Sequence, residues 1–315
     1  MAISRSAGGF SLIRPPASRI SPLVIVSSPA IIRSVVDLPH PDGPTTTRNS
    51  PSSIDIEMSS TATISSSPSW NIFVTESSAL TVGSVADVVV NRVSETGSDS
   101  PAPETTGAAL DGLSVNGEHN LVLVNQSDTL TVDEAISLVG KGNIRVEAQQ
   151  GELNVNAGIS SEFGNLSVLS SGSQTYGADG DVTTTAGSID VQATGANASI
   201  TMDATAVFST TIANVRVVAG GELTLGSVDT RYSVSLSAAN ITNAGAELNV
   251  SADQLRLVTT GEEDGDGAGT SSAHLNIDVD KLAADVKGNG TGGLFLTQAN
   301  DIRIGTLSEI NVNQV

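Results

Sequence analysis

The chain has 315 residues, enough for one or two ordinary domains, with 38% hydrophobic and only 3% aromatic residues. Its formal net charge of −20 is concentrated beyond residue 70, where thirty acidic residues outnumber nine basic ones. Such a surface repels phosphate backbones and anionic lipids, so nucleic acid is excluded as an expected partner. The absence of cysteine excludes disulfides and thiolate chemistry, and without a run of about 18 apolar residues we expect no membrane-spanning helix.

Residues 1–70 are predicted to be a disordered, low-complexity segment rich in Pro, Ser and Arg. They hold nine of the eleven prolines, and proline interrupts the hydrogen-bonded ladder of a sheet. Residues 38–44 (Leu-Pro-His-Pro-Asp-Gly-Pro) resemble strings found in spurious reading frames opposite transporter genes. This resemblance implies that residues 1–70 are not naturally translated together with the rest of the chain.

Residues 71–315 repeat a pattern of two apolar residues separated by one residue and followed by Gly, Asn or Asp. Period-2 alternation is typical of short strands with one buried face, and the small polar residues supply the turns. Corresponding pairs recur every 19 to 25 residues, a spacing typical of a solenoid, in which each turn of chain covers the next. Clear pairs are Ile144/Val146, Leu166/Val168, Ile189/Val191, Ile200/Met202, Leu223/Leu225, Leu248/Val250, Leu275/Ile277 and Leu294/Leu296.

The spacing predicts an all-β fold, a parallel β-helix or β-solenoid over residues 71–315 with rungs of about 20–25 residues. A longer repeat is superimposed on these rungs. Residues 72–93 align without a gap with residues 294–315 at an offset of 222, with six identities. Ten rungs of about 22 residues would fill this 222-residue super-repeat, so we expect roughly ten rungs. Neither end has a polar cap, and we therefore expect a fragment of a longer array.

The strings at residues 293–297, 301–304 and 280–284 resemble filamentous-haemagglutinin-like adhesins and related giant repetitive bacterial surface proteins. The resemblance covers residues 71–315. It implies a right-handed β-helix, export to the cell surface or the extracellular space, and a structural role in attachment without catalysis. It also implies two kinds of partner: an unknown receptor on a host cell, surface or matrix, and neighbouring repeats of the same parent protein.

Glu262, Glu263, Asp264 and Asp266 form the densest acidic cluster, on a loop that also contains glycine. Carboxylates spaced in this way can coordinate Ca²⁺, so they are the candidate metal ligands, and a Ca²⁺-stabilised exoprotein is one alternative function. The EF-hand spacing and the Gly-Gly-x-Gly-x-Asp nonapeptide are both absent. The competing interpretation is a solvated loop between rungs.

A polysaccharide-acting β-helix enzyme is the other alternative. Asp278 and Asp280 alternate on one side of an expected strand and could act as a carboxylate pair, although an outward-facing polar pair is the simpler interpretation. Such an enzyme requires three or more Asp, Arg or Lys side chains that converge in one groove. The sequence has no Gly-x-Ser-x-Gly motif and no histidine pair at ligand spacing, so we expect no catalytic residue and no required cofactor.

Overall fold

The computed structural model describes residues 63–66, 71–90, 104–107 and 109–315. These residues form strands and turns without a helix, which confirms the predicted all-β class. Most of the segment predicted to be disordered, residues 1–62 and 67–70, lies outside the described residues. Within that segment, β1 (Thr63–Ser66) pairs antiparallel with β2 (Ile72–Glu76), so strand pairing begins before residue 71.

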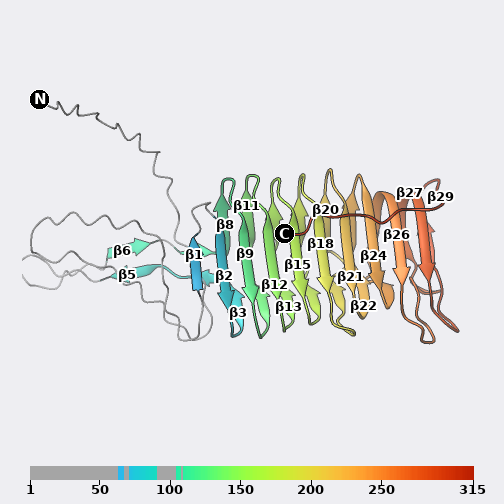
Figure 1. The fold of residues 1–315 in the computed structure, drawn as a ribbon, viewed down its shortest axis with the longest axis horizontal. Coiled ribbons are helices and arrows are strands. Elements are labelled where there is room, and N and C mark those ends of the chain that lie inside the picture. Colours follow the sequence, from blue (N-terminus) through green and yellow to red (C-terminus); the bar gives the residue numbers. More distant parts are fainter. Residues whose placement is uncertain (1–62, 67–70, 91–103, 108) are drawn as a thin grey trace, which may run out of the picture.

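The body of the chain is a parallel β-solenoid of about eight turns, seen in Figure 1 as a row of strands from β2 to β29. Each turn contributes one strand to each of three faces. The first face contains β2, β9 (Leu121–Asn125), β12 (Ile144–Ala148), β15 (Leu166–Ser170), β18 (Ile189–Ala193), β21 (Val215–Ala219), β24 (Ser233–Ala238) and β29 (Arg303–Ile304).

The second face is a separate sheet, and the third is continuous with the first through two long strands, β26 (Val250–Thr259) and β27 (Leu275–Val286). The second face contains β3 (Leu80–Val82), β10 (Leu130–Val132), β13 (Leu153–Val155), β16 (Gln174–Tyr176), β19 (Ile200–Met202), β22 (Glu222–Leu225) and β25 (Asn240–Asn243). The third contains β8 (Leu113–Asn116), β11 (Ile136–Val139), β14 (Ile159–Ser161), β17 (Val182–Thr184), β20 (Val207–Thr210), β23 (Ser227–Thr230) and β28 (Leu296–Gln298).

The first turn is much longer than the others, and this explains why the coil has fewer turns than the ten expected. Ile72 pairs in register with Leu121, 49 residues later. Between β3 and β8 the chain leaves the coil and forms two antiparallel pairs. These are β4 (Ser84–Val85) with β7 (Leu110–Asp111), and β5 (Val88–Val90) with β6 (Glu104–Gly107).

The predicted spacing is correct in the middle of the coil. Ile144 pairs with Leu166, and Leu166 pairs with Ile189, as expected from the intervals of 22 and 23 residues. Ile200 pairs with Leu223, which confirms the second series.

The predicted spacing is wrong towards the C-terminal end. Leu223 pairs with Ile241 and not with Leu248, and Leu275 pairs with Leu296 and not with Leu294. The loops between strands vary in length there, so equal intervals along the chain do not correspond to equal positions in the coil.

The two segments of the 222-residue alignment lie on different faces. Ile72 and Leu80 begin strands of the first and second faces. Their aligned partners differ, because Leu294 bridges to Ala268 in line with the second face and Ile302 directly precedes β29 on the first face. The super-repeat therefore stays a prediction, since the coil does not place its two copies in equivalent positions.

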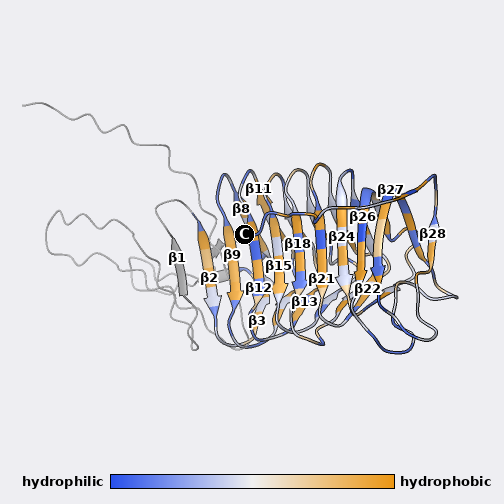
Figure 2. Cartoon of the chain, turned by 45° about the vertical axis from the view of Figure 1, so that its right-hand side comes forward, coloured by the Kyte–Doolittle hydropathy of each residue, from blue (hydrophilic) through white to orange (hydrophobic). Residues whose placement is uncertain are grey.

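The core consists of apolar side chains stacked in register from turn to turn. One column on the first face runs from Leu121 through Ile144, Leu166 and Ile189 to Val215, and each of these side chains is fully buried. Full burial of such a side chain stabilises the fold by about 1.5–3 kcal/mol. Figure 2 shows hydrophobic residues concentrated in the strands. Because every turn covers its neighbours, the solenoid has one continuous core.

A ladder of asparagines runs along the corner that precedes the first face. The Oδ1 atom of Asn120 accepts hydrogen bonds from the backbone N and the Nδ2 of Asn143, at 2.8 and 3.1 Å. Asn143 Oδ1 accepts the same pair of bonds from Asn165, at 2.9 and 3.0 Å. Asn165 Oδ1 in turn accepts from the N and Oγ of Ser188. These bonds satisfy donors at a corner, where the regular strand ladder is interrupted.

A column of glycines passes through the same corner. A Cβ atom on Gly164 would lie 1.6 Å from the carbonyl oxygen of Gly142, and one on Gly187 would lie 1.8 Å from the carbonyl oxygen of Gly164. The backbones of successive turns are thus too close for any side chain at these positions.

We expect Asn143→Ala to lower the free energy of unfolding by about 1–3 kcal/mol, because the Asn165 amide donors lose their acceptor. Urea denaturation followed by circular dichroism measures the change. The matched control is Asn154→Ala on the solvent-facing side of β13, for which we expect little change. Equal losses in the two variants would contradict a specific role for the ladder.

We expect Gly164→Ala to destabilise the coil by at least about 1–3 kcal/mol, because the added methyl group meets backbone and not a movable side chain. The control is Gly158→Ala, where the nearest atom to a new Cβ is 3.8 Å away. Differential scanning calorimetry of the two variants would show a lowered midpoint for the first alone. A similar midpoint for both would show that the corner can relax.

Candidate functional site

The four residues predicted as calcium ligands lie in the loop between β26 and β27. Asp264 Oδ1 accepts hydrogen bonds from the N and Oγ1 of Thr291, at 2.8 and 3.0 Å. Asp266 Oδ2 accepts from the backbone N of Glu263, at 2.8 Å. Glu262 and Glu263 have exposed side chains. Two of the four carboxylates thus bind donors of the protein itself.

The hydrogen bonds from the Thr291 amide and hydroxyl lower the pKa of Asp264. The contact is therefore complete above the ordinary pKa of an aspartate and is lost as the pH falls through the lowered value. It joins this loop to the neighbouring loop at residues 288–293, where a backbone bridge links Asp264 to Asn289. The carboxylate of Asp264 thus acts as a link between turns.

Across the described part of the chain, no three His, Asp or Glu side chains form a group that could hold a metal ion. The acidic loop brings its carboxylates near one another in sequence but directs Asp264 and Asp266 to different partners. Calcium binding at Glu262, Glu263, Asp264 and Asp266 stays a prediction for which the structure assembles no ligand set.

We expect the thermal midpoint of the chain to be the same in EDTA and in millimolar Ca²⁺, because the loop carboxylates are not arranged around a common point. Saturation of a specific site at about 100 times its Kd would add about 2.7 kcal/mol, which a calorimetric scan resolves easily. A Ca²⁺-dependent rise that disappears in Asp266→Asn would contradict this expectation.

Asp278 and Asp280, the candidate carboxylate pair, both lie on the solvent-facing side of β27, as the alternation predicts. Asp278 Oδ1 accepts a hydrogen bond from Asn300 Nδ2 at 2.8 Å, and Asp280 is exposed. Of the aromatic residues that could form a sugar platform, Tyr176 is instead buried against Phe208 in an edge-to-face contact of 4.7 Å. Burial raises the pKa of its phenol.

The sequence interpretation missed an ion pair on the outward side of the first face. Arg216 donates from Nε to Asp190 Oδ1 at 2.8 Å and from a terminal nitrogen to Oδ2 at 2.9 Å. Asp190 is fully buried although it points away from the core, and these bonds raise the pKa of Arg216. The signal was present in the sequence, since in-register pairing of Ile189 with Val215 places Asp190 opposite Arg216.

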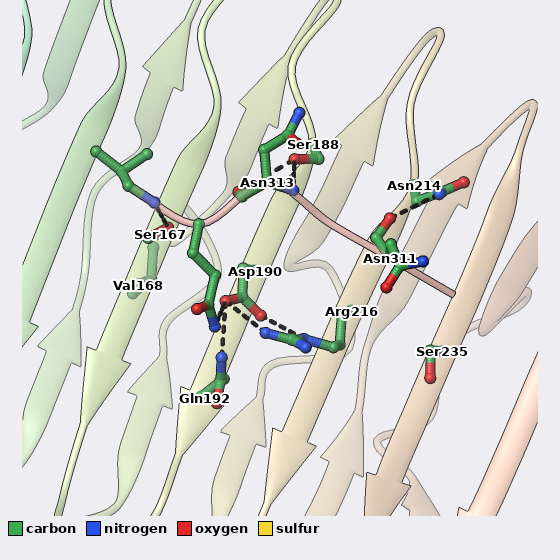
Figure 3. Close-up of polar contacts among 12 residues, drawn as sticks. Ser167, Val168, Ser188, Asp190, Gln192, Asn214, Arg216, Ser235, Asn311 and Asn313 are labelled. Atoms are coloured by element: carbon green, nitrogen blue, oxygen red, sulfur yellow. Dashed lines mark hydrogen bonds and ion pairs between the residues drawn. The ribbon is translucent and has the colours of Figure 1, made fainter. Parts of the chain in front are cut away.

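Residues 305–315, here called the strap, cover this ion pair. The strap leaves the last turn and runs back over the outer side of the first face, so that the C-terminal end lies beside the middle of the coil (Figure 1). Gln314 Nε2 donates to Asp190 Oδ2 at 2.9 Å, from the same side as Gln192 Nε2 at 2.7 Å (Figure 3).

The strap is held to several successive turns by polar contacts. Asn311 O accepts from Asn214 Nδ2 at 2.8 Å, and the backbone N of Asn313 donates to Ser188 Oγ at 2.9 Å. The backbone N of Val315 donates to Ser167 Oγ at 3.0 Å. Figure 3 shows the strap crossing these strands, with its side chains reaching the serine and asparagine side chains below.

A groove of about 350 Å³ opens between the start of the strap and the first face. Its charged lining residues are one lysine, Lys281, and one acid, Glu309, and the other lining residues are polar or aliphatic. The three or more converging Asp, Arg or Lys side chains that a polysaccharide-acting enzyme requires are not assembled in this groove.

No helix among the described residues is long and apolar enough to cross a membrane. The chain matches no protein-family model, no curated protein and no solved structure. The class of protein is therefore defined by the fold alone, and the chain is a parallel β-solenoid built from stacked repeats.

Proposed function

We propose that this chain is a segment of the structural shaft of a secreted or cell-surface adhesin and contributes to attachment without catalysis. The observation that carries the proposal is the uninterrupted apolar core, which joins successive turns into one rod. With a strand spacing of about 4.8 Å, the eight or so turns span about 40 Å along the axis. Repeated end to end, such units would hold a binding region far from a cell.

The arrangement of the polar groups supports a passive role. Asp190 is engaged by Arg216, and Asp264 by Thr291, so these carboxylates bind partners within the fold. A catalytic site would instead direct several such groups into an open groove. The shaft surface is acidic, which favours solubility and limits unspecific adhesion to other anionic surfaces.

The resemblance to filamentous-haemagglutinin-like adhesins supports the finer part of the proposal. It suggests an extracellular or cell-surface location, an unknown receptor on a host cell, surface or matrix, and neighbouring repeats of the parent protein as contacts along the shaft. The solenoid fold is compatible with each of these, because stacked turns can continue indefinitely without a new core.

Replacement of this segment within its parent protein tests the proposal. In the source cells, deletion of the segment should lower attachment, because the binding region is brought nearer the cell. We expect an unrelated β-solenoid with the same number of turns to restore attachment, since a passive shaft contributes length and stiffness alone. Attachment is measured by counting adherent cells, with display of the parent confirmed by antibody on intact cells.

Failure of the unrelated solenoid to restore attachment, with normal display, would show that this segment itself binds a receptor or acts on one. Incubation of the purified chain with a panel of polysaccharides then separates these cases. New reducing ends or unsaturated products would identify an enzyme and overturn the proposal.

A further inference from the structure

The two ends of the solenoid core are finished differently. At the N-terminal end, Val74, Leu80 and Leu113 represent the three faces, and each is 1% exposed. At the opposite end, Ile304 on the first face is 75% exposed and Leu294, in line with the second face, is 43% exposed. The apolar column is therefore closed at one end and open at the other.

The open end continues core columns that are buried in every preceding turn. Val234, Leu255 and Leu282 are at most 4% exposed, and the next member of their column is Ile304. On the second-face column, Ile241 and Ala268 are fully buried and the next member is Leu294. The side chains at this end thus have the composition of core residues but the exposure of surface residues.

The backbone at the open end is also available for pairing. Within the described residues, β28 and β29 pair with β27 on one side, and no strand pairs with their other side. The strap turns away along the side of the coil and does not cover them (Figure 1). Natural edge strands are commonly protected by inward-pointing charges or proline, yet the inward residues here are Leu296, Gln298 and Ile304.

We infer that the open end binds the open end of a second copy of this chain, around a twofold axis. Head-to-tail stacking is disfavoured because the inward residues of the first turn are already buried and β1 lies antiparallel along β2. A twofold contact uses the same surface on both partners and closes after two copies. An axis that crosses one face places its last strand antiparallel to its own copy, which is a normal ladder geometry.

The contact depends on the coil and not on an adhesive role, so the two proposals fail separately. The mass of the full chain in solution, measured by light scattering over a concentration series, provides the first test. We expect twice the 31.8 kDa of one chain. Ile304→Asp should weaken dimerisation at least tenfold, because it places a charge in the centre of the contact.

The matched control is Ile212→Asp, which changes an equally apolar residue that is 52% exposed in a mid-coil turn between β20 and β21. It should leave the dimer unchanged. A monomer at every concentration, or equal loss in both variants, would overturn the inference. Growth into an open series of larger species would show head-to-tail stacking and would also overturn it.

A cross-linking test covers the case in which Ile304→Asp fails to fold. The chain has no cysteine, so Thr297→Cys, at an exposed position of β28, introduces a single thiol. Mild oxidation should yield a disulfide-linked dimer. Thr201→Cys, at an exposed position of the mid-coil strand β19, is the control and should remain monomeric in denaturing gels. Equal cross-linking of the two variants would count against an end-to-end contact.

Discussion

In-register stacking of parallel strands is the constraint on which the rest of this structure depends. Ile144 must lie directly over Leu121 and under Leu166, because the ladder hydrogen bonds fix the strands about 4.8 Å apart. Each side chain then fills the space left by the one before it. Loops can vary in length only where they leave this register intact, and the 49-residue first turn shows how far they can depart from the coil.

The same stacking decides where polar residues can lie. At the corner before the first face, Asn120, Asn143 and Asn165 satisfy one another's backbone donors from turn to turn. Gly142 and Gly164 allow the close backbone approach that this corner needs. The outer surface is under much weaker constraint, so it can carry acidic residues or a binding partner without disturbing the core. A shaft that needs stiffness and solubility, and no chemistry, is consistent with this division.

The strap and the open end are two consequences of the way the last turns are built. The strap satisfies its backbone through serine and asparagine side chains of the first face, and it encloses Asp190 with Arg216. A buried carboxylate that lost this arginine would be costly, so the pair and the strap stabilise one another. Ile304 is left exposed because the strap runs along the coil and not across its end.

The sequence by itself determined the strand pattern, the β-solenoid class and the pairing of Ile144, Leu166 and Ile189, because period-2 alternation and near-constant spacing are local properties of the chain. It also contained Asp190 and Arg216 at matching strand positions. Only the tertiary structure decided that Leu223 lies beside Ile241, that the acidic loop binds Thr291, and that the strap folds back onto Ser167 and Ser188. These contacts depend on loop lengths and on the path of a segment in three dimensions, which no periodicity along the chain records.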